Sequence, residues 1–110
     1  MLGGYFLYFI KAGKFVKIGV AKDISRRIKE LQTGNPHELQ LIHAEWFTDK
    51  YAALDAEKKL HAHFRDIQTV GEWFEAMQVE FYINALHDNT YRARPQPLEN
   101  YKRAISKLSF

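Results

Sequence analysis

Glu57 has an unusual position in the stretch ALDAEKKLHAHF, residues 53–64. If this stretch is a helix, each residue turns about 100° from the last, so Glu57 falls within the apolar stripe that contains Leu60 and Phe64. His61, four residues further on, lies at the edge of the same stripe and is able to contact Glu57. A buried ionised carboxylate is costly unless a cation compensates it. Glu57 is therefore either one half of a structural ion pair with Arg or Lys, or a functional residue.

Two strands are expected before this helix. Residues 4–20 contain two runs rich in aromatic and β-branched residues, separated by Ala12 and Gly13, and this pattern predicts a β-hairpin. If that pair forms the turn, Tyr8 lies opposite Lys17, and both point to a mixed face of the hairpin. The other face carries the expected core residues: Leu7, Phe9, Val16 and Ile18.

A helix is predicted within the stretch DISRRIKELQTGNP, residues 23–36, with Pro36 beyond its end. Asp23 is a suitable N-cap, and Gly34 marks the C-terminal end. On this helix Arg27 flanks the apolar stripe and points toward the body of the protein, whereas Arg26 points almost the opposite way. The two adjacent arginines therefore have different roles.

The remaining elements follow from periodicity and punctuation. We expect a third strand at residues 39–47, and Thr48 or Asp49 as the cap of the helix that carries Glu57. Later segments predict a short edge strand at 71–75, a helix at 77–88, a break at 94–97 and a final basic helix.

The composition is that of one α+β globular domain of 110 residues, with 46% hydrophobic and 15% aromatic residues. Residues 1–90 would form the domain, with residues 91–110 as a basic helical extension of it. The chain has no cysteine, which excludes disulfides, thiol catalysis and cysteine zinc sites. Lys11 and Gly13 interrupt the apolar start too early for a membrane span, and no basic leader precedes it. We expect a cytoplasmic protein.

The positive charge is concentrated near the end of the chain. The net charge is +3, and residues 91–110 hold five basic residues against Glu99 alone. This asymmetry indicates a polyanionic partner, although a solvated helix would have the same composition.

Taken in order, these residues resemble the GIY-YIG nuclease superfamily over residues 4–75. The similarity is greatest to its small single-domain branch, common in phages and bacteria, whose second motif is KIG. The matching segments are Tyr8 in YFIK, Lys17 to Gly19, Arg27 in SRRIKEL followed by LQTGNP, Glu57 in DAEKKLHAHF, and GEWF at 71–74. The resemblance implies a three-stranded antiparallel sheet flanked by helices.

The resemblance also implies metal-dependent hydrolysis of nucleic-acid phosphodiesters. Glu57 would be the sole protein ligand of one divalent cation, Mg²⁺ or Mn²⁺, since hard cations prefer oxygen ligands. Tyr8 would be the general base for the attacking water, or would position it. A phenol has a reference pKa of about 10, so we hypothesise that Lys17 lowers the pKa of Tyr8. Most members of the superfamily have a second tyrosine where this chain has Lys17.

Other site residues carry over with an alternative beside each. Arg27 would bind the scissile phosphate, or else pair structurally with Glu57. His61 would orient a metal-bound water or assist Tyr8, or else be a hydrogen-bonded core histidine. Gly19 would allow close approach of backbone or substrate. Further contacts to nucleic acid are expected from Lys22, Arg26, Arg92 and Arg94.

Three functions remain after this comparison. The first is an endonuclease, with DNA favoured over RNA as its substrate. The second is a non-catalytic nucleic-acid binding module with the GIY-YIG fold, and the third is a scaffold protein. A homodimer is one way in which a single centre could cut two strands. Trp73 and Phe74 are expected in the core rather than as base-stacking platforms.

Overall fold

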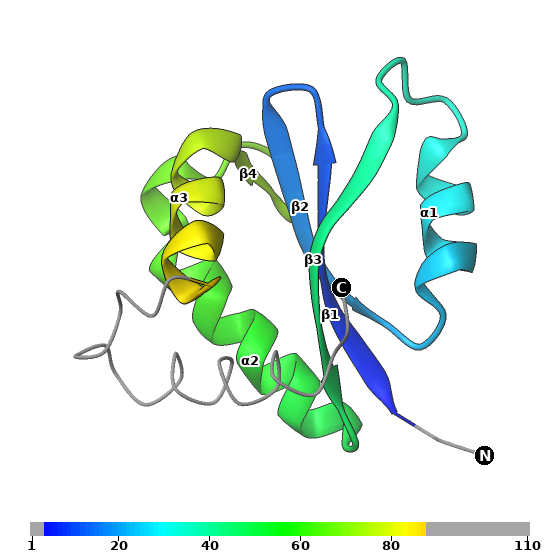
Figure 1. The fold of residues 1–110 in the computed structure, drawn as a ribbon, viewed down its shortest axis with the longest axis vertical. Helices are drawn as coiled ribbons and strands as arrows, with labels where there is room; N and C mark the ends of the chain where they lie inside the picture. Colours follow the sequence, from blue (N-terminus) through cyan, green and yellow to red (C-terminus); the bar gives the residue numbers. More distant parts are fainter. Residues whose placement is uncertain (1–3, 88–110) are drawn as a thin grey trace.

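The computed structural model describes residues 4–87, which form an α+β domain with helices on both faces of one antiparallel sheet (Figure 1). The elements in chain order are β1 (Tyr5–Ala12), β2 (Phe15–Ala21), α1 (Ile24–Gln32), β3 (Leu39–Phe47), α2 (Lys50–His63), a 3₁₀ turn (Arg65–Ile67), β4 (Trp73–Glu75) and α3 (Ala76–His87). The predicted basic helix in residues 91–110 lies outside the described residues.

The sheet has four strands in the order β3-β1-β2-β4. The edge strand predicted from GEWFE is confirmed, because Trp73 to Glu75 pair with Phe15 to Lys17. The three-stranded sheet implied by the resemblance was therefore wrong in its strand number, while the α+β class is confirmed.

The register of the β1–β2 hairpin differs from the prediction by two residues. The turn consists of Gly13 and Lys14 rather than Ala12 and Gly13, and Gly13 has a φ of 61°, a conformation that glycine adopts without strain. Tyr8 consequently lies opposite Gly19, not Lys17. Since side chains alternate with a period of two, a shift of two residues leaves every side chain on its predicted face.

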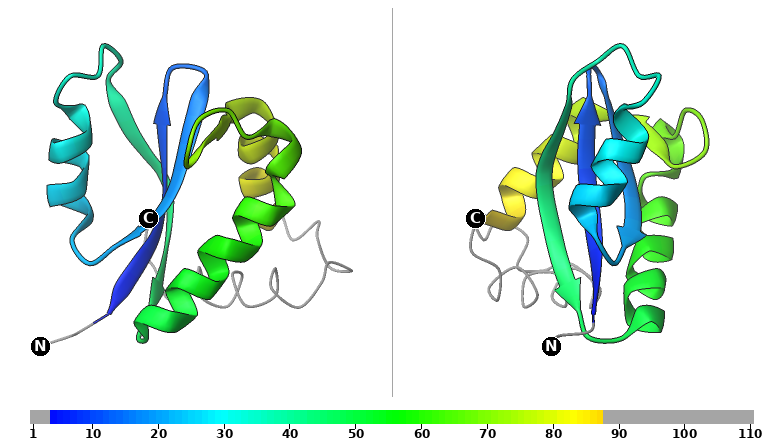
Figure 2. Two further views of the ribbon diagram at one scale, coloured as in Figure 1. Left: turned by 180° about the vertical axis from the view of Figure 1, so that it is seen from behind. Right: turned by 90° about the vertical axis from the view of Figure 1, so that its right-hand side faces the viewer.

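Both faces of the sheet are buried. One face packs against α2 and α3, and the other packs against α1, as the two views in Figure 2 show. The first core contains the expected hairpin residues Leu7, Phe9, Val16 and Ile18. The second contains Tyr8 and Ile10, covered by Ile24, Ile28 and Leu31 of α1. The face predicted to be mixed is therefore a second core, and Tyr8 is only 1% exposed.

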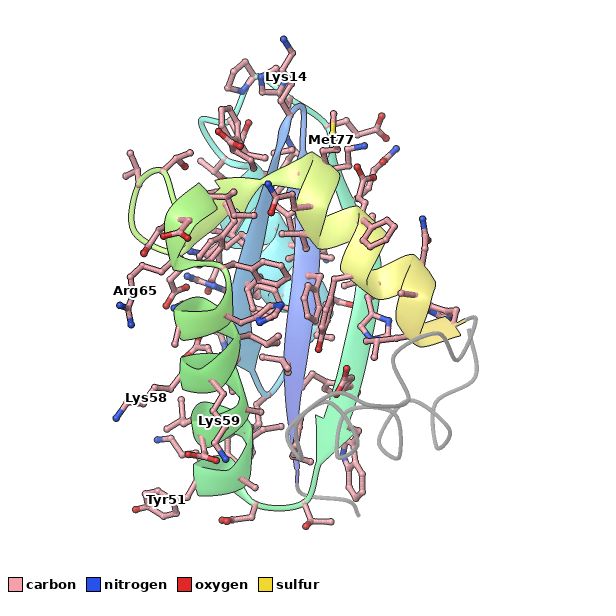
Figure 3. All side chains as sticks on the ribbon, turned by 90° about the vertical axis from the view of Figure 1, so that its left-hand side faces the viewer. Lys14, Tyr51, Lys58, Lys59, Arg65 and Met77 are labelled. Carbon is pink, nitrogen blue, oxygen red and sulfur yellow. The ribbon has the colours of Figure 1, made fainter. Side chains whose placement is uncertain are left out.

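The helix N-termini agree with the predicted caps. The Asp23 carboxylate accepts a hydrogen bond from the backbone N–H of Arg26 at 3.1 Å, and Asp49 accepts one from Ala52 at 3.3 Å. Lys58 and Lys59 lie on the outer side of α2, away from the sheet (Figure 3). Within residues 4–87, no helix is both long and apolar enough to cross a membrane.

One polar pair lies inside the first core. His43 Nε2 is 3.1 Å from Glu45 Oε2, and the two residues are 2% and 0% exposed. Burial, followed by the charge of His87, lowers the pKa of His43 to about 4. Burial also raises the pKa of Glu45 well above its usual range. Each shift favours the neutral form of its group.

The short β4 leaves part of β2 uncovered. Its pairing with β2 ends at Lys17, and the last backbone bond on that side runs from Ile18 N–H to the Glu72 carbonyl at 3.1 Å. The segment that begins at this bond, Ile18–Ala21, pairs on that side with no further strand of residues 4–87, and we call it the open edge of β2. Because no strand of residues 4–87 covers this edge, side chains from both faces of the sheet meet there.

Candidate active site

Tyr8 reaches the open edge from the α1 side of the sheet. The Arg27 Nε–H donates to Tyr8 Oη at 3.4 Å. Directly opposite is Gly19, where an added Cβ would lie 2.5 Å from Tyr8 Oη and 2.7 Å from Cζ. The absence of a side chain at Gly19 is therefore what allows the phenol to lie across β2. The group that comes close is therefore a side chain, whereas backbone or substrate was predicted there, and an approach of substrate stays a prediction.

Lys17 is paired with a residue that the sequence did not single out as functional. Its Nζ lies 3.0 Å from Glu72 Oε1, and its side chain is only 10% exposed. The same Nζ is 5.6 Å from the centroid of the Trp73 ring. Glu72 also borders the tyrosine, since its Oε1 would be 3.2 Å from a Cβ on Gly19.

The loop before β4 presents Glu72 through backbone bonds. Thr69 N–H donates to the Trp73 carbonyl at 2.8 Å, and Trp73 N–H donates to the Val70 carbonyl at 2.9 Å. Gly71, between them, has a φ of 54°, which favours glycine. The segment GEWF therefore combines a turn glycine, an acidic site residue and the edge strand. The sequence marked GEWF as a motif and as a short edge strand, but nothing in it singled out Glu72 as a site residue.

Glu57 approaches the open edge from α2, on the other side of the sheet. It is half-buried at the rim of the helix rather than in the centre of its apolar stripe, which consists of Ala53, Ala56, Leu60 and Phe64. Glu57 was predicted to lie within the apolar stripe, and it lies instead at its margin, because Leu54 beyond it is exposed. Within residues 4–87, no ion pair or hydrogen bond joins Glu57 to another side chain.

The electrostatics of Glu57 reflect this position. Burial raises the pKa of its carboxyl group, and the negative charge of Glu72 raises it further. His61 and Lys17 oppose the shift without cancelling it. The carboxylate is therefore undercompensated by the described side chains, and an added cation would favour its ionised form.

Tyr8 also has a raised pKa. Burial is the largest cause, the hydrogen bond and charge of Arg27 oppose it, and the charges of Glu72 and Glu57 add to it. The hypothesis that Lys17 lowers the pKa of Tyr8 was wrong. Arg27 is the opposing cation, because Lys17 is paired with Glu72. Tyr8 is thus a neutral phenol at neutral pH.

Arg27 does not form the structural ion pair with Glu57 that was its alternative. Its Nη1 lies 3.2 Å from Glu30 Oε1 on the same helix, and its side chain is 39% exposed. The guanidinium therefore contacts Tyr8 at one nitrogen and faces solvent with much of its surface. This placement leaves donors for an incoming anion.

His61 bonds to the backbone of the open edge. Its Nε2 is 2.9 Å from the Ile18 carbonyl oxygen, and its ring lies 5.0 Å from that of Phe74. A carbonyl only accepts, so Nε2 carries the proton and donates it. His61 therefore ties α2 to β2 beside Glu57. This geometry fits the hydrogen-bonded alternative, and a catalytic role for His61 stays a prediction.

The expected nucleic-acid contacts have different positions. Arg26 is exposed and pairs with Glu30 at 3.5 Å. Lys22 follows β2, and its Nζ is 5.7 Å from the Tyr5 ring centroid. Both lie near the ends of the elements that carry Gly19 and Arg27. Arg92 and Arg94 lie outside the described residues.

The donor set suits a hard cation better than a soft one. Glu57 is the residue able to hold it, with Glu72 as a second carboxylate in the same electrostatic cluster. Carboxylate oxygens are ligands that Mg²⁺ and Mn²⁺ prefer, and Mg²⁺ commonly uses one or two of them with water and phosphate oxygens. Across residues 4–87, no group of three or more His, Cys, Asp or Glu side chains is arranged to hold a metal ion.

Comparison with known proteins gives one match. A family model described as "T5orf172 domain" matches residues 5–90. Curated proteins and solved structures give no match. The family is associated with nucleases and DNA binding, so a nucleic-acid partner agrees with it at that level.

This match corrects the resemblance to the GIY-YIG nuclease superfamily, which was wrong as an assignment of family. The segments that carried it are short, from three residues (KIG) to ten (DAEKKLHAHF), and the rest of the resemblance was their order along the chain. Lys17 also replaces the second tyrosine of that superfamily's name. The geometry at the open edge of β2 does not depend on the assignment.

Proposed function

The chain belongs to the T5orf172 domain family, and from this premise we propose that it is an endonuclease that hydrolyses phosphodiester bonds of nucleic acid, with DNA as the main substrate. One divalent cation, Mg²⁺ or Mn²⁺, would assist at Glu57. The observation that carries the proposal is the meeting of a phenol, a guanidinium and an undercompensated carboxylate at the open edge of β2.

Arg27 binds the scissile phosphate in this proposal. Its charge is permanent, and its planar group offers paired donors that match two phosphate oxygens. The hydrogen bond from Nε to Tyr8 fixes the direction of the fork. Glu30 takes one N–H of Nη1, so Nη2 and the second N–H of Nη1 remain for the substrate. As the reaction adds negative charge to the phosphoryl oxygens, this interaction strengthens.

Tyr8 positions the attacking water in its neutral form. Its raised pKa makes it a weak candidate for a base that is already ionised. Instead, its oxygen accepts from Arg27, and its own O–H is free to donate to a water or phosphate oxygen at the edge of β2. Gly19 provides the space for that group.

Glu57 supplies the carboxylate for the cation. A bound Mg²⁺ or Mn²⁺ would polarise the phosphate and lower the pKa of a coordinated water. Glu57 must be ionised for this role, whereas burial and Glu72 favour its protonated form. Lys17 partly offsets the charge of Glu72 through their ion pair and so keeps the cluster from becoming too negative.

The test is a cleavage assay on supercoiled plasmid, single-stranded DNA and RNA, with Mg²⁺, Mn²⁺ or chelator. We expect cleavage by the native chain that is lost with chelator and in Glu57→Gln. Arg27→Ala should reduce the rate by about 10²- to 10³-fold, the usual effect of removing one preorganised charge donor. Lys59→Ala, on the outer side of α2, is the matched control and should cleave normally.

A nucleic-acid binding module without turnover is the second candidate. The ion pair between Lys17 and Glu72 favours it, because that lysine is already neutralised by a protein carboxylate. Binding to the same substrates without any cleavage would support this module and exclude the endonuclease. A chain that neither binds nor cleaves would be the scaffold.

A further inference from the structure

A pocket opens beside the candidate active site. Its volume is about 290 Å³, and its walls come from the turn of the hairpin, the loop after α1 and the loop before β4. The lining residues that matter here are Phe15, Asn35, His37, Thr69, Val70 and Trp73. Two of the apolar ones are open to solvent: Phe15 is 41% exposed and Val70 is 74% exposed.

The pocket and the active site share Trp73. In the β2–β4 pairing Trp73 lies opposite Lys17, and the lysine Nζ is 5.6 Å from the centroid of the indole ring. Glu72, the residue before it, is bonded to the same lysine. An apolar, aromatic wall therefore adjoins the Lys17–Glu72 ion pair of the candidate active site.

The walls are also preorganised. The Thr69 backbone N–H and hydroxyl both donate to the Trp73 carbonyl, at 2.8 and 3.1 Å. The Gln68 side chain donates to the carbonyl of Gly71 within the same loop. A loop closed in this way keeps Val70 and Trp73 in place before any ligand arrives, which lowers the entropic cost of binding.

These features match a ligand with a flat apolar ring next to an anionic group. A volume of about 290 Å³ lies at the lower end of the range for small-molecule pockets, so it suits one ring system better than a larger ligand. Aromatic side chains bind nucleobases by stacking, while amide and imidazole groups pair with base edges. Asn35 and His37 provide those two polar groups.

We propose that this pocket takes one unstacked nucleobase of the strand whose phosphate lies against Arg27. The inference rests on the proposed function, because it assumes a nucleic-acid partner at the open edge of β2. It also names a substrate class, which is nucleic acid with an unstacked base. A base within a duplex is stacked on both sides and cannot enter, so single-stranded or locally opened nucleic acid should bind better than a continuous duplex.

Binding is measured with single-stranded oligonucleotides in chelator, so that affinity is separated from hydrolysis. Phe15→Ala should weaken binding about 5- to 100-fold, the effect of losing one base–aromatic contact. Phe81→Ala is the matched control: Phe81 is 67% exposed and lines, together with Phe15, a separate groove along α3. Its affinity should stay within about twofold of the native value. Equal weakening by both variants would overturn the proposal.

A second measurement uses the native residues of the pocket. The chain has two tryptophans, so in a Trp46→Phe variant the tryptophan fluorescence comes from Trp73 alone. Bound single-stranded oligonucleotide should quench its fluorescence, and replacing one nucleotide by an abasic one at the matching position should remove the quenching. If the oligonucleotide binds and the fluorescence of Trp73 is not quenched, the proposed base pocket is wrong.

The plasmid assay reports the proposed hydrolysis separately. Cleavage together with unchanged Trp73 fluorescence would overturn the base pocket and leave the endonuclease intact. Quenching without cleavage would support the pocket and exclude the endonuclease. A chain that neither binds single-stranded oligonucleotide at low salt nor cleaves plasmid would overturn both.

Discussion

At the scale of single residues, Gly19 and Tyr8 determine whether the site can exist. The two face each other across β1 and β2, and the phenol occupies the space that any side chain on Gly19 would need. The tyrosine is also buried, so it has little freedom to move aside. Glycine is therefore required here by space rather than by backbone conformation.

Gly19→Ala should both destabilise the fold and displace the phenol from Arg27. Overpacking of this kind costs about 1–3 kcal/mol in the free energy of unfolding, measurable by urea denaturation, and cleavage should fall more than the folded fraction. Gly34→Ala is the control: an added Cβ there meets nothing within 4 Å, although its φ of 78° makes alanine strained. It should lose about 1 kcal/mol and cleave normally. Normal cleavage by folded Gly19→Ala would contradict the packing argument.

The buried His43 and Glu45 pair should make stability depend on pH above neutrality. Between the ordinary pKa values of 4.5 and 6.5 the unfolded pair holds one proton, on the histidine. The folded pair also holds one, since the pKa of Glu45 is raised and that of His43 is lowered. Above pH 6.5 the unfolded pair holds none, while the folded pair keeps its proton until the raised pKa of Glu45 is reached. Stability is therefore lost as pH rises through that range.

Urea denaturation between about pH 6 and pH 9 tests this prediction. The free energy of unfolding should fall by up to about 1.4 kcal/mol per pH unit while the one-proton difference lasts. Glu45→Gln should flatten the dependence, because the amide does not titrate. Glu80→Gln, an exposed carboxylate paired with Lys11, is the comparison and should keep the native slope. The same slope in Glu45→Gln would show that another group is responsible.

At the scale of elements, the loop before β4 adjusts the active site through Glu72. Its carboxylate is bonded to Lys17 and raises the pKa of Glu57 by repulsion. Three hydrogen bonds to backbone carbonyls within residues 69–73 fix the loop that presents it. The loop before β4 thus influences the pKa of Glu57, which lies on α2.

Glu72→Gln should lower the pKa of Glu57, because it removes a negative charge and leaves Lys17 unpaired. In the proposed mechanism cleavage requires ionised Glu57, so activity should be lost as pH falls through the pKa of that group. In the variant, this acid limb of the pH–rate profile should move to lower pH. Glu75→Gln, two residues from Trp73 on the exposed side of β4, should leave the limb in place. An unmoved limb in Glu72→Gln would separate Glu72 from Glu57.

The elements themselves could be predicted well. Asp23 and Asp49 mark two helix starts by local capping chemistry, and runs of aromatic and β-branched residues identify the hairpin strands. The hairpin register could not be predicted, because a turn at Ala12–Gly13 and a turn at Gly13–Lys14 leave the side chains on the same faces. The helical wheel likewise gives the stripe on α2 but not which of its margins faces the sheet, so Glu57 was placed too deep. Glu72 was missed because loop residues have no periodicity.

At the scale of the whole molecule, the question is which cations contact the phosphate backbone. Lys22 and Arg26 lie at the ends of β2 and α1 near the site, whereas Lys58 and Lys59 lie on the outer side of α2 (Figure 3). Both pairs contribute equally to the net charge. The two pairs have the same charge and different positions, so one pair serves as the control for the other.

Combined replacement of Lys22 and Arg26 by alanine should reduce the salt dependence of oligonucleotide binding. Each lost phosphate contact lowers the slope of log K against log salt by about 0.7–0.9. Alanine at Lys58 and Lys59 should change the intercept slightly and leave the slope unaltered. Replacing Arg92 and Arg94 tests the predicted contribution of the C-terminal segment by the same readout. Equal slopes for the first two double variants would show that contact is not localised to the β2 and α1 ends.

The open edge of β2 carries a complete set of site residues only when both helical layers are folded. Tyr8 and Arg27 arrive from one layer and Glu57 from the other, so a partly folded chain lacking either α1 or α2 has an incomplete set of reactive groups. Such a species would be silent toward substrate even with its sheet intact. Turnover in rising denaturant should therefore be lost when the first of the two helices detaches, and no turnover should remain after that point.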